Sequence, residues 1–219
     1  MKYSIKEVMP KIFLVTTKDQ FDLAMLFWRY QEYYESPNKS FYRKSFTLID
    51  HMKWYSKNIG EGSFSYAYDW AGFNIPSFVV TDCIRQKIKD RNIYDNEMLL
   101  VYKNIFIKNK MSHNFYIIGC PEASNKKIIQ HELAHGLFAT NKAYKKDMLR
   151  LVKQLPAKKK QAFNKILTDM SYNKTVHDDE IQAYCSTGLY ASMKVLNLGK
   201  STCKAFKEVY IKYAFSRKT

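Results

Sequence analysis

The chain has 219 residues, of which 46% are hydrophobic and 26% are charged, and this composition excludes a disordered or low-complexity protein. A chain of this length suits one core, so residues 1–219 are expected to form a single domain. The formal net charge of +16 comes mostly from lysine, and no groove-reading or base-stacking motif accompanies it. Nucleic acid is therefore not an expected partner.

Export and membrane insertion are not indicated either. No uninterrupted apolar stretch reaches the roughly 20 residues that cross a bilayer, and the N-terminus lacks the apolar segment of a secretory signal. The four cysteines form no Cys-x-x-Cys pair, so reduced thiols are the simplest interpretation. We expect a cytoplasmic protein without a membrane partner, and export by a route that uses no cleaved signal stays open.

Short apolar runs and amphipathic stretches alternate at the start of the chain. Residues 11–16 (KIFLVT) have the β-branched composition of a buried strand, and Asp19 is placed to cap a helix that ends near Tyr34. Glu32 and Glu35 lie at the end of this helix. We expect them to be solvated charges there and not to shape a pocket. A second helix is expected over residues 46–57.

The middle of the chain is predicted to mix strands and helices. Residues 64–68 (FSYAY) alternate like a half-buried strand, and a loop is expected to contain Asn74, Ile75 and Pro76. Short helices follow near residues 78–89 and 96–102. Residues 114–119 (NFYIIG) read as a strand, either an edge strand that pairs with an extended substrate or a strand paired on both sides.

Residues 131–135 read His-Glu-Leu-Ala-His, the H-E-x-x-H pattern. Positions four apart lie one turn apart on the same helix face, so His131 and His135 can both reach one zinc ion. Glu132 can then take a proton from a metal-bound water and deliver it to a leaving amine. Ser124 or Asn125 can cap the helix, which is expected to reach about Thr140. Two core histidines without a metal are the alternative.

A catalytic zinc normally has three protein ligands, so a third is needed. The segment 175–184 (TVHDDEIQAY) is predicted to be a helix capped by Thr175 or Asp178. We place the third ligand at Glu180, with Asp179 and His177 as alternatives. Alternatively, both carboxylates have no ligand role and only interact favourably with the dipole at the N-terminus of the helix.

The order of H-E-x-x-H, a helical hairpin and a helix with Glu resembles the gluzincins, on His131, Glu132, His135 and Glu180. The resemblance implies a zinc metallopeptidase. Gluzincins commonly carry an Asp four residues after the ligand Glu, whereas this chain has Tyr184, so Asp178 or Asp179 could support a histidine instead.

Four segments taken together resemble a group of small, uncharacterised prokaryotic proteins classed as metallopeptidases on their H-E-x-x-H helix. They are QEYYESP (31–37), DWAGFNIP (69–76), HELAHGLF (131–138) and DEIQAY (179–184). This resemblance implies no particular substrate.

These observations predict an α+β protein with a small mixed sheet in the N-terminal half and a mostly helical C-terminal half that carries the zinc-binding helices. The expected function is hydrolysis of a peptide or protein substrate with Zn²⁺ as cofactor and Glu132 as general base. Tyr184 is a candidate oxyanion donor, with ordinary packing as its alternative. The rival function is a zinc-stabilised module that binds nucleic acid or acidic protein without hydrolysis.

Overall fold

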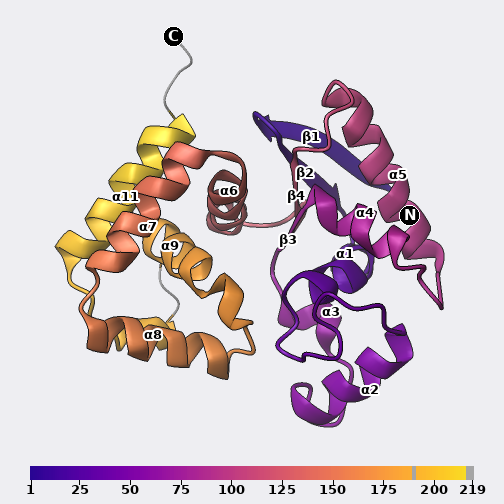
Figure 1. Ribbon diagram of the computed structural model, residues 1–219, viewed down its shortest axis with the longest axis horizontal. Helices are drawn as coiled ribbons and strands as arrows, with labels where there is room; N and C mark the ends of the chain where they lie inside the picture. Colours follow the sequence, from indigo (N-terminus) through magenta and orange to yellow (C-terminus); the bar gives the residue numbers. More distant parts are fainter. Residues whose placement is uncertain (189–190, 216–219) are drawn as a thin grey trace.

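The computed structural model describes residues 1–188 and 191–215, and a mixed sheet forms the centre of its first half (Figure 1). The strands are β1 (Tyr3–Met9), β2 (Ile12–Thr17), β3 (Phe73–Pro76) and β4 (Tyr116–Pro121), in the order β1-β2-β4-β3. β1 and β2 form an antiparallel hairpin, β4 lies parallel to β2, and β3 is antiparallel to β4. The predicted α+β class with a small mixed sheet is confirmed.

Helices fill the connections from β2 to β3 and from β3 to β4, and almost all of the described chain after β4. The first group is α1 (Gln20–Glu35), α2 (Leu48–Asn58), α3 (Tyr66–Asp69), α4 (Ser77–Arg85) and α5 (Ile93–Lys108). The second is α6 (Lys126–Thr140), α7 (Lys142–Gln154), α8 (Ala157–Asp169), the 3₁₀ turn η1 (Lys174–Val176), α9 (His177–Thr187), α10 (Ala191–Lys194) and α11 (Lys200–Phe215). Among the described residues, no helix combines the length and apolarity that crossing a membrane requires.

The sheet separates two hydrophobic cores, because side chains alternate in direction along a strand. On β4, Ile117 packs into a core that includes residues of α1, α4 and α5, whereas Tyr116 and Ile118 pack into a core that includes residues of α6, α7 and α9. Figure 1 shows α6 between the sheet and the other C-terminal helices. Gly136 allows this approach, since a Cβ there would lie 2.9 Å from Ile12 Cδ1.

Several predicted elements are confirmed. Residues 11–16 correspond to β2, and the predicted helix from Asp19 is α1, whose Asp19 side chain accepts a hydrogen bond from the backbone of Phe21. The predicted helix over 46–57 is α2, and the metal-site helix is α6, capped by Asn125 rather than Ser124. The helix expected near 96–102 begins earlier, because Asn92 and Asp95 form a capping box one turn upstream, and it continues to Lys108.

Residues 64–68 do not form the predicted strand. Tyr66 begins the helical turn α3, and Ser65 Oγ donates to Asp69 Oδ2 at 2.7 Å across that turn. The alternation of residues 64–68 reflects an aromatic cluster in which Phe64 and Tyr66 stack on each other, 6.0 Å between ring centroids. A period of two over five residues was too short to distinguish a strand from this packing.

The predicted loop around Asn74 to Pro76 is also wrong, because these residues belong to β3. A proline inside an apolar run is compatible with a strand at the edge of a sheet, where its missing N–H need not face a neighbour. β4 lies between β2 and β3, so of the two alternatives for residues 114–119 the strand paired on both sides is correct. The edge strand beside α6 is therefore β3.

Candidate metal centre

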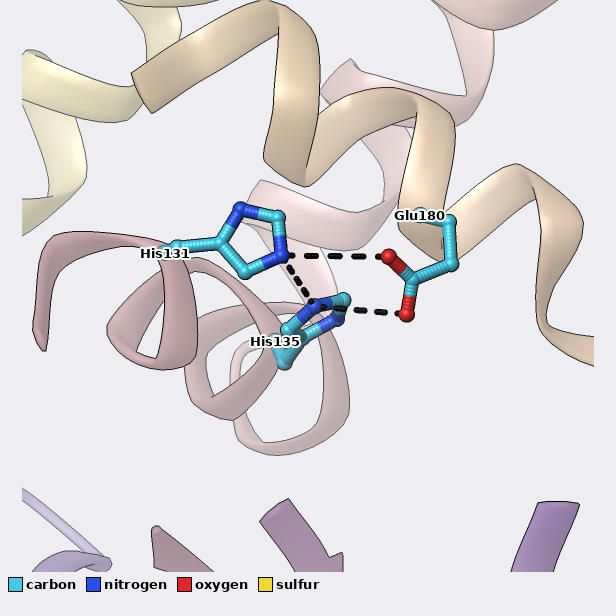
Figure 2. A group of neighbouring side chains, drawn as sticks. All are labelled: His131, His135 and Glu180. Atoms are coloured by element: carbon cyan, nitrogen blue, oxygen red, sulfur yellow. Dashed lines mark hydrogen bonds and ion pairs between the residues drawn. The ribbon is translucent and has the colours of Figure 1, made fainter. Parts of the chain in front are cut away.

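His131, His135 and Glu180 converge at the contact between α6 and α9 (Figure 2). One ligand atom from each of the three lies within 4.8 Å of the others. The two histidine Nε2 atoms are 3.2 Å apart, and the carboxylate oxygens of Glu180 lie 3.8 Å from His131 Nε2 and 3.5 Å from His135 Nε2. The structure therefore brings Glu180, the preferred third ligand, together with the two histidines.

The two histidines reach the same point because they lie on consecutive turns of α6. Glu180 joins them from the first turn of α9, which follows α7 and α8 in the chain. His135 and Glu180 are almost completely buried, with 3% and 4% of their side chains exposed. Buried polar groups need partners, yet Glu180 Oε2 has no hydrogen-bond partner in the described part of the chain.

The outer nitrogens of the two imidazoles have partners of their own. His135 Nδ1 lies 2.9 Å from Asp179 Oδ1, and His131 Nδ1 lies 3.3 Å from Thr187 Oγ1. A proton on each Nδ1 would leave the lone pair of each Nε2 free on the side of Glu180, which is the tautomer that coordination through Nε2 requires. Asp179 thus supports a histidine from behind, as expected for Asp178 or Asp179.

The other alternative ligand, His177, is not part of the group. Its Nε2 lies 3.4 Å from the carbonyl oxygen of Tyr172. The predicted helix exists as α9, but neither Thr175 nor Asp178 caps it. Thr175 instead lies in η1, which Asn173 caps.

Burial shifts the titration of all three candidate ligands. It raises the pKa of Glu180 to about 7 and, together with the neighbouring His135, lowers the pKa of His131 to about 4. Burial also lowers the pKa of His135, but the carboxylates of Asp179 and Glu180 outweigh this effect and raise it well above its ordinary value. Such opposed shifts occur where ionisable groups share a dry site, which is typical of functional centres.

Glu132 lies beside the histidines, and residues of the sheet hold its carboxylate in place. Its Oε2 accepts a hydrogen bond of 2.9 Å from Asn74 Nδ2, and Asn74 Oδ1 accepts one of 2.5 Å from the hydroxyl of Tyr116. Gly72 passes so close that a Cβ there would lie 2.5 Å from Glu132 Oε1. Burial raises the pKa of Glu132, which favours a group that can both accept and return a proton.

Two tyrosines adjoin the other side of the histidine pair. The ring of Tyr184 lies 4.6 Å from that of His131, and its hydroxyl is 2.8 Å from the hydroxyl of Tyr172. Trp70 packs edge-on against Tyr172 at 5.9 Å. Tyr184, chosen from sequence, is thus next to a candidate ligand and is also packed, whereas Tyr172 was missed.

The prediction that Glu32 and Glu35 form a solvated helix end is wrong. Glu32 is buried, with Oε2 2.9 Å from His51 Nε2. Glu35 is half-buried and accepts a hydrogen bond from Gln31 Nε2, and burial together with the charge of Glu180 raises the pKa of Glu35 well above its ordinary value. Asn74, which holds Glu132, was not among the residues predicted for the site, although it lies within the DWAGFNIP segment (69–76) on which a resemblance rests.

Two hollows lie next to the metal centre. One of about 220 Å³ is lined by His131, Tyr184 and Lys127. The other, of about 570 Å³, includes Asp179 and Tyr34 in its wall. Both provide access to residues that contact the candidate ligands.

Comparisons with known proteins identify no family and no relative. No family model matches the chain, and neither a curated protein nor a solved structure is significantly similar to it.

Proposed function

We propose that this protein is a zinc-dependent hydrolase of the peptidase type. The observation that carries the proposal is the convergence of His131, His135 and Glu180 within 4.8 Å, although Glu180 lies on a different helix and more than forty residues after His135 in the chain. Two imidazoles and one carboxylate are a ligand set that catalytic zinc sites use, with one coordination position left for water or substrate.

A purely structural zinc site is less compatible with this arrangement, because structural sites are commonly closed by four protein ligands. Among the described residues, the group contains three. Glu132 is buried beside them without belonging to the group, and Asn74 holds its carboxylate. A buried carboxylate without a ligand role fits a general base.

The residues of the chain divide the proposed reaction between them. Zinc, when bound, supplies Lewis acidity toward a water and the scissile carbonyl. Glu132 accepts the proton of the attacking water and delivers it to the leaving amine, while Asn74 keeps its carboxylate oriented. The hydroxyl pair of Tyr172 and Tyr184 is the candidate donor to the oxyanion of the tetrahedral intermediate.

The deciding experiment combines metal content with turnover. Wild type is expected to carry about one zinc per chain and to cleave members of a peptide library. Glu132→Gln should keep the zinc and lose hydrolysis by about 10²- to 10⁴-fold, the usual contribution of a general base. Glu208→Gln, on the exposed face of α11, is the matched control and should behave as wild type.

Two results would reject this function. Turnover undiminished in Glu132→Gln would exclude the assigned base. A zinc-loaded wild type that cleaves no peptide but binds acidic protein or nucleic acid in a salt-sensitive manner would favour the zinc-stabilised binding module.

A further inference from the structure

The outer edge of β3 is the place where an extended substrate would normally be expected to pair with the sheet. In the β3–β4 ladder, Phe73 lies opposite Gly119 and Ile75 opposite Ile117, and Ser77 N continues it by donating to Phe115 O at 3.0 Å. In an antiparallel ladder the hydrogen-bonding direction alternates. The backbone groups of Asn74 and Pro76 therefore point away from β4, toward the edge.

Neither of these two residues offers a donor to a further strand. The backbone N–H of Asn74 already donates to Gln31 Oε1 at 3.1 Å, and Pro76 has no N–H. Adding a strand requires donors and acceptors in alternation along the edge. β3 in this state cannot supply that pattern.

Gln31 is held in this position from its own helix. Its Nε2 donates to Glu35 Oε1, one turn further along α1, and α1 packs directly against β3. Both ends of the Gln31 amide are therefore engaged, one by the strand and one by Glu35. The side-chain amide takes the place that a peptide group of a paired substrate would occupy.

We infer that Gln31 closes the sheet edge to extended substrates, so the site acts on short peptides or other compact amides that reach the metal without pairing to β3. This inference rests on the proposed hydrolase function. Of the two hollows, the one that His131 itself lines has about 220 Å³, which is smaller than the roughly 300–1,000 Å³ of pockets for drug-sized ligands, whereas the hollow of about 570 Å³ beside Asp179 falls within that range.

The test measures binding without turnover, in zinc-loaded protein carrying Glu132→Gln. The probes are an octapeptide and the tripeptide of its central residues, both blocked at each end and followed by calorimetry. With Gln31 present, the two should bind within about threefold of each other. Adding Gln31→Ala should tighten octapeptide binding at least about fivefold, because the N–H of Asn74 becomes free to donate to the peptide backbone, and leave the tripeptide unchanged.

A matched control and a second measurement keep the inference testable if the proposed function fails. Gln161→Ala, in an exposed position of α8, should change neither peptide's affinity. Amide exchange of Asn74 should become at least about tenfold faster in Gln31→Ala, because its acceptor is lost. This readout needs neither zinc nor hydrolysis, whereas absence of hydrolysis by wild type would reject only the hydrolase.

Two outcomes would overturn the inference. One is an octapeptide that binds at least tenfold tighter than the tripeptide while Gln31 is present, with no further change in Gln31→Ala. The other is an Asn74 amide whose exchange rate is the same with and without the Gln31 side chain.

Discussion

Replacing Asp179 tests whether its carboxylate binds the metal directly or only supports the ligand His135. The carboxylate of Asp179 lies 2.9 Å from Nδ1 of His135, on the side of the ring opposite the nitrogen that faces Glu180. Partners of this kind contribute about 10- to 100-fold to metal affinity, or about 1.4–2.8 kcal/mol. Asp179→Ala should therefore weaken zinc binding by that amount and still allow full occupancy at high zinc.

The neighbouring variants complete the comparison. Glu180→Ala should lose more than about 100-fold, because a bond to the metal itself disappears. His177→Ala, two residues before Asp179 in the chain, should bind zinc as wild type does, since its ring faces the carbonyl of Tyr172.

The assay is competitive titration of the metal-free protein with zinc against a chelator of known affinity, with circular dichroism to verify that each variant is folded. The reasoning is refuted if Asp179→Ala abolishes zinc binding while Glu180→Ala retains it, because Asp179 would then be the ligand.

Three further outcomes are expected. Zinc affinity should fall by roughly tenfold per pH unit for each proton that must be released, because zinc needs Glu180 ionised and His135 neutral. The neighbouring carboxylates raise the pKa of His135 well above its ordinary value, and burial raises the pKa of Glu180 to about 7, so the proton on Glu180 adds to the loss below about pH 7; a pH-independent affinity in the same titration would contradict this. Gly72→Ala should lower kcat with zinc content unchanged, since the added Cβ would lie 2.5 Å from Glu132 Oε1; equal kinetics for variant and wild type would exclude that contact. Phe163→Ala, in the fully buried centre of the C-terminal core, should cost about 3–5 kcal/mol in urea unfolding of metal-free protein, and a loss below 1 kcal/mol would show that this core is loosely packed.

The amino-acid sequence by itself determined the parts of the site that depend on local geometry. Two histidines four residues apart share one face of any helix, and the apolar run with its Asn125 cap makes that helix form. For the same reason α1 could be predicted from Asp19 and the residues that follow it. Glu180 could be proposed, but Asp179 and His177 on the same turn could not be set aside.

The tertiary structure decided what depends on contacts between distant residues. The approach of α9 to α6 brings Glu180 to the two histidines of the candidate metal group and places Asp179 beside Nδ1 of His135. The position of β3 at the sheet edge brings Asn74 to Glu132, 58 residues away, and Gln31 to Asn74, 43 residues away. No periodicity within a segment encodes such pairings, because they arise only when packing of the two cores against the sheet fixes where separate segments meet.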